Sequence, residues 1–249
     1  MDETRNSSAI ILNRSDYRES DSLITLYTKN FGKLTLVARG TKKINSKLSG
    51  HLEPISLVNI LLIKGKGFDY IGSALCDNAY LNIKDNLNKI YYSGRVLNWF
   101  NRLVRDGESD ERLFLLLRRW LEVTDSYPDE EFTKENGELF FIFFALKLMT
   151  ELGYKPEMYE CLSCREKIAP GKNYFNLKNG GLVCEACFNK ERLSQDISVA
   201  EILIISDNCI KLMRFILDNK LDMAQKLKID KKVIKELSTL TTNFLNFHS

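Results

Sequence analysis

Four cysteines, arranged as two close pairs, are the residues of this chain best suited to chemistry. Cys161 and Cys164 form one C-x2-C pair, and nineteen residues later Cys184 and Cys187 form a second. Two such pairs at this separation are typical of a zinc site, because each pair supplies two thiolates from one tight turn. Four cysteines complete the tetrahedron and leave no open position for water. The sequence therefore predicts one structural Zn2+ per chain.

Two other interpretations of these cysteines are two disulfides or four unrelated core thiols. The stretch from Met1 to Arg5 carries acids and no apolar segment, so we expect no secretory signal and no oxidising compartment. Unrelated thiols would not pair twice at one spacing, which favours zinc in a cytoplasmic protein. The metal would contribute on the order of 10 kcal/mol to folding a segment too small for its own core. Cys76 and Cys209 stand alone and are expected to be small core hydrophobes.

The remaining composition excludes several classes of function. The chain has 249 residues, a formal net charge of +3 and only two histidines, His51 and His248. Two histidines so far apart in sequence give poor support to a catalytic triad or a multi-histidine metal centre. There is no phosphate-cradling G-x4-G-K-[ST] loop. No apolar run approaches the length that crosses a bilayer. We therefore expect a protein that is not an enzyme and does not associate with membranes.

The first eighty residues have the pattern of strands separated by turns. Glycines punctuate the pattern at 32, 40, 65 and 67, and the polar residues 13–16 are expected to interrupt it near the start. Five strands in so short a stretch suit a small closed barrel such as an OB-fold, with a five-stranded sandwich as the alternative. The expected strands cover residues 8–12, 23–27, 34–39, 55–63 and 68–80.

Basic residues are concentrated in this same stretch. Residues 29–52 contain six cations and no acid. Cations on loops can grip a phosphate backbone without reading bases, although a solvated basic face is the alternative. Phe31, Phe68 and Tyr70 could stack on unpaired bases, but we expect them in the barrel core. The candidate DNA-binding residues are Lys33, Arg39, Lys42, Lys43, Lys47, Lys64 and Lys66.

From Asn82 onward the apolar period changes to that of helices. One helix should end before residues 106–109, and Ser109 should cap the next. The apolar run 138–152 should be a central helix that ends at Gly153. A capping box at 198–201 predicts a helix beginning near Ile202, and residues 231–247 predict a last helix. Because helices flank the cysteines, we expect the zinc module to be an insertion. Its two pairs should be linked by two short strands around the turn at Gly180 and Gly181.

Several short motifs, in this order, resemble the RecO family of bacterial DNA repair and recombination mediators. Each motif alone is modest, whereas their order and spacing together are specific. The resemblance covers essentially the whole chain. In the first half the motifs are Tyr17–Leu23, Phe31–Leu34, Val37–Gly40 with Lys42 and Lys43, and Leu52–Pro54; in the second half they are Leu152–Pro156, the two cysteine pairs, and Gly180 with Gly181.

The resemblance implies a multidomain α and β protein. Its parts would be an OB-fold at 1–81 that binds DNA, a helical domain at 82–159, a zinc module at 160–190 and C-terminal helices at 191–249. It implies binding of single- and double-stranded DNA, annealing of complementary strands, and help in loading the RecA recombinase onto strands coated by single-stranded DNA-binding protein. The implied location is cytoplasmic and nucleoid-associated.

The implied partners are RecR and the acidic tail of the single-stranded DNA-binding protein, with RecA reached indirectly. Phe144 and Lys147 are the residues we expect near the tail-binding pocket. Two rival functions remain open. One is a zinc-braced protein–protein adaptor without intrinsic annealing activity. The other is a nuclease, for which Asp16, Glu19 and Asp21 are the nearest acidic cluster.

Overall fold

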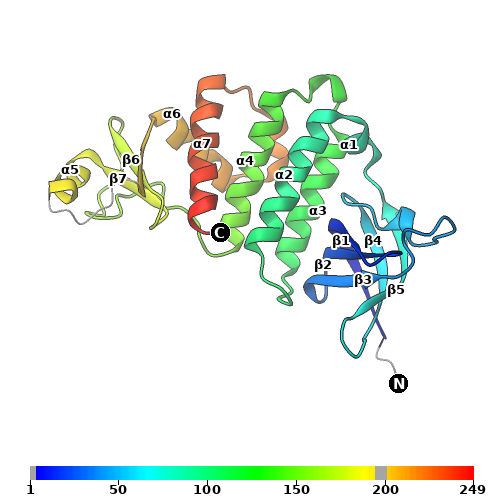
Figure 1. Ribbon diagram of the computed structural model, residues 1–249. Helices are drawn as coiled ribbons and strands as arrows, with labels where there is room; N and C mark the ends of the chain where they lie inside the picture. The colour runs from blue at the N-terminus through cyan, green and yellow to red at the C-terminus, as the bar shows by residue number, and fades with distance from the viewer. Residues whose placement is uncertain (1–3, 194–200) are drawn as a thin grey trace. The chain divides into compact units, whose positions relative to one another are not determined.

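The computed structural model describes residues 4–193 and 201–249 (Figure 1). The chain divides into two compact units, Met1–Glu131 and Phe132–Ser249. The first unit contains a β-sheet followed by helices, and the second contains helices and a smaller sheet.

Five strands of the first unit form one sheet that closes on itself as a barrel, with strand order β1-β2-β3-β5-β4. All neighbours are antiparallel except β3 and β5, which meet in parallel at Val37 and Tyr70. The barrel core is made of small and branched apolar side chains, among them Ala9, Ile24 and Val58. The strands are β1 (Thr4–Tyr17), β2 (Asp21–Thr28), β3 (Gly32–Ala38), β4 (Leu57–Ile63) and β5 (Tyr70–Asn78), with a 3-10 turn η1 (Ser49–His51) between β3 and β4.

The first strand is longer than expected. Residues 13–16, predicted to break it, instead continue the ladder with β2, where Asn13 pairs with Thr25 and Asp16 with Ser22. A register shift between Ile11 and Asn13 marks a bulge. On the N-terminal side of that bulge the strand also pairs with its other neighbour, β4, from Thr4 to Ile10. The prediction of a break was wrong because polar residues on a barrel's outer face look like a loop in sequence.

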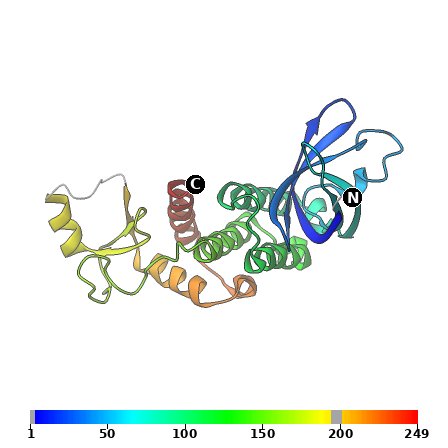
Figure 2. The same cartoon turned by 90° about the horizontal axis from the view of Figure 1, so that it is seen from below.

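Three helices complete the first unit. Helices α2 and α3 run side by side in both views (Figures 1 and 2). Asp110 caps α3 by accepting from the amide of Arg112, so the expected cap at Ser109 was wrong by one residue. Lys89 is fully buried, and its ammonium donates to the carbonyl of Tyr127 and pairs with Asp129. The helices are α1 (Leu81–Asp85), α2 (Leu87–Leu103) and α3 (Glu111–Ser126), followed by a 3-10 turn η2 (Asp129–Glu131).

In the first unit the barrel is fastened to the loop between α2 and α3 through a glycine. Gly32 has a left-handed φ of 69°, and a Cβ there would lie 2.3 Å from the carbonyl oxygen of Glu108. The amide of Gly107 donates to the carbonyl of Lys33 in the same contact. Tyr27 lies beside it, with its hydroxyl accepting from the amide of Asp110.

We expect Gly32→Ala to lower the free energy of unfolding by more than about 2 kcal/mol, because a left-handed L-residue and a backbone clash act together. Gly107→Ala is the matched control. It also has a left-handed φ, 74°, but a Cβ there meets nothing within 4 Å. The difference between the two variants in chemical denaturation isolates the clash. Equal losses in both variants would contradict the packing role of Gly32.

In the second unit a helix buried on nearly every side lies at the centre. Its residues from Leu139 to Leu146 are all buried, as the unbroken apolar run predicted. It packs against α6, α7 and η4. The helix ends at Glu151, and Gly153 follows with a φ of 91°. The helices are α4 (Lys134–Glu151), α5 (Glu185–Leu193), α6 (Asp207–Asp218) and α7 (Lys231–Phe247), with a 3-10 helix η4 (Leu221–Lys226).

A three-stranded sheet of order β7-β6-β8 holds the cysteine segment. Strands β6 (Asn173–Asn176) and β7 (Gly181–Cys184) are the two short strands expected around the glycine turn. Strand β8 (Ile202–Ile205) was expected to begin a helix but pairs along β6, from Ile202 opposite Asn176 to Ile205 opposite Asn173. Helix α6 begins only at Asp207, capped by Ser206. The proposed capping box begins at Ser198, which lies outside the described residues.

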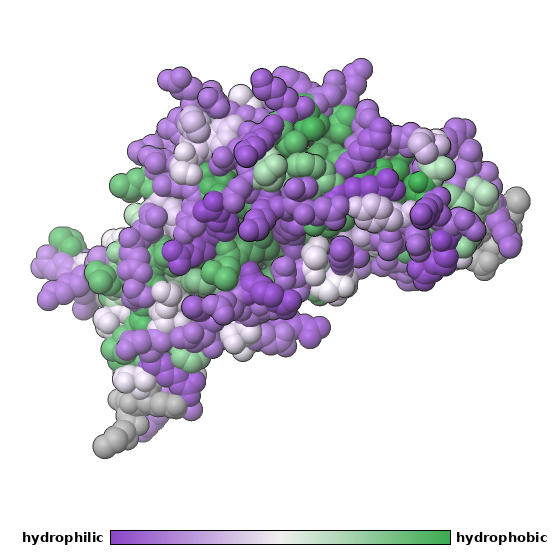
Figure 3. Space-filling view, turned by 180° about the vertical axis from the view of Figure 1, so that it is seen from behind, coloured by the Kyte–Doolittle hydropathy of each residue, from purple (hydrophilic) through white to green (hydrophobic). Residues whose placement is uncertain are grey.

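No helix among the described residues is long and apolar enough to cross a bilayer. The face drawn in Figure 3 is largely hydrophilic, with hydrophobic residues gathered in smaller patches.

Candidate functional site

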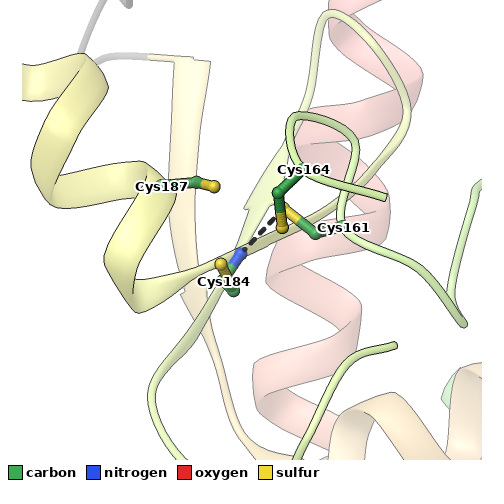
Figure 4. Close-up of side chains that lie close together, drawn as sticks. All are labelled: Cys161, Cys164, Cys184 and Cys187. Atoms are coloured by element: carbon green, nitrogen blue, oxygen red, sulfur yellow. Dashed lines mark hydrogen bonds between the residues drawn. The ribbon is translucent and has the colours of Figure 1, made fainter. Parts of the chain in front are cut away.

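The four paired cysteines meet at one point of the second unit. Their sulfur atoms all lie within 4.8 Å of one another. Figure 4 shows that Cys161 and Cys164 come from one loop, whereas Cys184 ends β7 and Cys187 lies on the first turn of α5. The amide of Cys184 donates to the sulfur of Cys161 over 3.4 Å, so the two turns face each other. All six cysteines of the chain are free.

The sheet and its turns fix these two loops. The amide of Leu162 donates to the carbonyl of Leu182, and the amide of Arg165 donates to the carbonyl of Cys161. Tyr174 and Phe188 stack with centroids 3.7 Å apart, which fastens α5 to the sheet. Among the described residues, a small apolar cluster around Cys161 and Val183 packs beside the cysteines. So small a core suits a segment that needs a metal to hold it.

The thiols have opposed tendencies to ionise. Burial of Cys161 opposes ionisation, but hydrogen bonds from the backbone at Cys164, Cys184 and Ser163 lower its pKa to about 6. Burial and the neighbouring sulfurs raise the pKa of Cys187. The Cys161 thiolate therefore forms readily, while Cys187 resists becoming a second anion beside it. A cation at the centre removes that repulsion and favours the ionised form of all four.

The donor set fits zinc. Four thiolates around Zn2+ at about 2.3 Å place the sulfurs about 3.8 Å apart, and the observed cluster is within reach of that geometry. One sulfur is buried, two are half-buried and Cys164 is exposed. A closed shell of four thiolates has no position for a substrate, so the chemistry available here is structural.

In the first unit, two of the predicted DNA-binding cations are already engaged. The ammonium of Lys33 donates to the carbonyl of Asn101 over 2.7 Å and pairs with Asp106, and its side chain is only 13% exposed. The ammonium of Lys42 pairs with Asp16 over 3.1 Å and donates to the carbonyl of Arg18. Sequence reasoning missed these partners, because they lie far from the lysines along the chain.

Three of the other predicted cations, Lys43, Lys47 and Lys66, are exposed to solvent. Within the described part of the chain, the ammonium groups of Lys43, Lys47 and Lys66 have no hydrogen-bond or ion-pair partner. The exposed Arg39 lays its guanidinium over the ring of Tyr70, 4.3 Å from the centroid. Lys64 lines a small pocket with Arg5 and Phe31.

The loop that carries the free lysines has a defined anchor. The amide of Gly40 donates to the carboxylate of Asp21, and the amide of Lys42 donates to the carbonyl of Ser20. The buried hydroxyls of Ser22 and Thr41 are 2.8 Å apart. The basic loop, residues 39–47, therefore begins against the β1–β2 turn.

Two of the three aromatic residues expected in the barrel core lie outside it. Tyr70 is half-buried at the start of β5 and carries the guanidinium of Arg39 over its ring. Phe31 is half-buried and packs against the barrel core. Phe68 was also expected in the core but is 65% exposed, which corrects that prediction. It lies in the turn between β4 and β5, and the flanking Gly65 and Gly67 were the sequence signal for a loop.

The two residues expected near a partner pocket have structural contacts. Phe144 is fully buried within α4. Lys147 is half-buried, and its ammonium donates to the carbonyl of Leu217 at the end of α6. Loss of hydration on burial lowers the pKa of Lys147. Their part in partner binding stays a prediction.

Both halves of the chain match models of one protein family. Residues 1–79 match the model described as recombination protein O N terminal, and residues 84–249 match recombination protein O C terminal. The chain belongs to the RecO family. The expectation drawn from its short motifs is thus confirmed. Membership in this family supports a role in DNA repair and recombination.

Similar proteins named DNA repair protein RecO match most of the chain. The RecO of Dehalococcoides mccartyi is 29% identical over 232 residues, which is 92% of this chain and 84% of the relative. The RecO of Alkaliphilus metalliredigens is 27% identical over 248 residues, which is 96% of this chain and 94% of the relative. That of a Thermoanaerobacter species is 25% identical over 240 residues, covering 96% and 90%. The similarity therefore extends through both units.

Proposed function

We propose that this RecO-family protein is a DNA-binding recombination mediator. It binds single- and double-stranded DNA, anneals complementary strands and assists the loading of recombinase onto strands coated by single-stranded DNA-binding protein. The observation that carries the proposal is the acid-free basic loop, with Lys43 and Lys47 unpaired among the described residues, on a RecO-type N-terminal part.

The barrel supports this function. The strand order β1-β2-β3-β5-β4 suits an OB-fold, a barrel in which loops between strands commonly bind oligonucleotides. We propose the OB-fold for residues 1–81, helical parts for 82–159 and 191–249, and a zinc module for 160–190. Strand β8, which falls in the segment 191–249, pairs with β6 of the proposed module.

The mechanism is electrostatic. Two complementary strands repel each other through their phosphates, and cations that neutralise phosphates lower that repulsion. Base pairing then supplies the driving force. No covalent bond is made or broken, so the proposal needs no nucleophile, general base or nucleotide. Zn2+ stabilises the module and takes no part in annealing.

We extend the proposal to the partners and location of the family. These are RecR, the acidic tail of the single-stranded DNA-binding protein, RecA indirectly, and a cytoplasmic site at the nucleoid. Lys147 and Phe144 are proposed only as neighbours of the tail site, because one is engaged with Leu217 and the other is buried.

Strand annealing without nucleotide tests the proposed function. Two complementary labelled oligonucleotides are mixed with the purified protein at low and at moderate salt. We expect rapid annealing that slows as salt rises, because counterion release drives phosphate binding. Failure to accelerate annealing, together with an absence of DNA binding by anisotropy, would favour the zinc-braced adaptor instead.

A further inference from the structure

A pocket of about 300 Å³ opens on the barrel beside the basic loop. Its walls come from the end of β1 and the turn after it, the end of β3, and the turn between β4 and β5. This volume is at the small end of the range for ligand sites and suits a group of nucleotide size. The side chains that matter for its chemistry are Tyr17, Arg18, Arg39, Lys66, Phe68 and Tyr70.

The pocket offers an aromatic surface that the protein does not cover. Phe68 is 65% exposed, although its ring contacts Tyr17 edge to face with centroids 6.4 Å apart. The turn that presents it is tightly built, because a Cβ at Gly65 would lie 2.1 Å from the carbonyl oxygen of Phe68. Single exposed apolar residues are common on surfaces, so exposure alone says little. Phe68, however, lies at the rim of a cationic pocket, where its exposed ring can contact a bound ligand.

Cations line the same pocket. The guanidinium of Arg18 lies 5.1 Å from the centroid of Tyr17, and that of Arg39 lies 4.3 Å from that of Tyr70. Arg18 adopts a left-handed φ of 49°, a conformation that is strained for an L-residue. Such strain is concentrated at functional sites. The pocket thus combines flat rings with guanidinium groups held beside them.

One acid also lines the pocket, and one of its two oxygens, Oδ1, is occupied. The carboxylate of Asp21 accepts from the amide of Gly40 over 2.8 Å and from the hydroxyl of Ser20 over 3.2 Å. Three cations, Arg18, Arg39 and Lys66, outnumber it. An anionic group is therefore favoured over a cationic one.

We propose that this pocket holds one unpaired nucleotide of a DNA strand, with its base stacked on Phe68 and its phosphate beside Arg18 and Arg39. The inference rests on the proposed function and names the part of DNA that the barrel recognises. A base inside a duplex has both faces covered by its neighbours, so it cannot use this ring. The rest of the DNA strand passes over the basic loop, which lies next to the pocket wall. Lys42 holds the two together, because its ammonium donates to the carbonyl of Arg18 and its amide donates to the carbonyl of Ser20.

Two oligonucleotides with equal phosphates and different bases test the proposal. One is a short oligothymidylate, and the other is an oligomer of the same length with tetrahydrofuran in place of every base. In fluorescence anisotropy the wild-type protein should bind the thymidylate about 5- to 100-fold more tightly, as expected for stacking of one base. Phe68→Ala should bring this ratio close to one without changing the salt slope, and Phe68→Trp should retain the ratio.

Tyr91→Ala is the matched control. Tyr91 is 60% exposed on α2 of the same unit, outside the pocket, and its loss should leave the ratio unchanged. Because Phe68 is largely in solvent, its alanine variant should keep the wild-type circular dichroism and melting temperature. A wild-type affinity ratio of one overturns the proposed nucleotide subsite, and so does a Phe68→Ala variant that keeps the wild-type ratio. In either case, annealing by the wild-type protein would still support the mediator function. If the wild-type protein shows the expected affinity ratio but does not accelerate annealing, the nucleotide subsite is supported and the mediator function is overturned.

Discussion

Cys161→Ser should abolish zinc binding and unfold the cysteine module. The expected zinc content falls from one ion per chain to near zero, because serine replaces the buried sulfur that accepts from the amide of Cys184. A structural zinc contributes on the order of 10 kcal/mol to a small module, far more than the apolar cluster around Val183 can replace. Metal analysis after gel filtration measures the first effect. Amide hydrogen exchange over β6 and β7 measures the second.

Cys76→Ser separates loss of zinc from loss of any thiol. Cys76 is half-buried in the barrel, outside the cysteine cluster, and this variant should keep one zinc per chain. Exchange over α2 and α3 should be the same in both variants, since these helices belong to the other compact unit. A Cys161→Ser protein with full zinc content would show that the cluster is not a four-thiolate site.

Removing the free lysines should flatten the salt dependence of DNA binding. In the triple variant Lys43→Ala, Lys47→Ala and Lys66→Ala, three unpaired ammonium groups are lost without breaking an ion pair between described residues. For single-stranded DNA each phosphate contact contributes about 0.7 to the slope of log K against log salt, so the slope should fall by about 2. Affinity at low salt should fall about 10- to 100-fold, and similarly for different sequences.

The matched control removes three exposed lysines from the second unit, as Lys220→Ala, Lys226→Ala and Lys228→Ala. Net charge changes equally in the two variants, so a general loss of attraction would affect both. We expect the control to keep the wild-type slope. An unchanged slope in the barrel variant would remove the basic loop from the DNA-binding surface.

The parts of the fold that depend on local sequence could be predicted well. The last helix was expected at 231–247 and is α7 (Lys231–Phe247), because a strong helical period follows a capping residue, Asp230. The cysteine cluster could be predicted equally well, since one spacing rule identifies all four candidate ligands. The central helix α4 followed from an apolar run too long for a strand.

The parts that depend on distant partners could not be predicted. Residues 202–205 are a short apolar run, which periodicity alone cannot assign to a strand or a helix, and their partner β6 lies about thirty residues away. Similarly, nothing near Lys33 in the sequence indicates that its ammonium is engaged, whereas in the structure it contacts Asn101 and Asp106. For Phe68, the neighbouring Gly65 and Gly67 indicate a loop, but the exposure of its ring depends on how that loop leaves the barrel.

The double pairing of β1 has a consequence for the order in which the barrel assembles. Ala9 pairs with Thr28 in a local hairpin and also with Val58 on β4. The hairpin closes a short loop, whereas the ladder to β4 closes a loop of about fifty residues, and long loops cost more entropy to close. During synthesis that second ladder must wait until β4 has left the ribosome. Until then one edge of β1 is an unsatisfied template for strands of other chains, so a growing chain is most exposed to misassembly before its barrel closes.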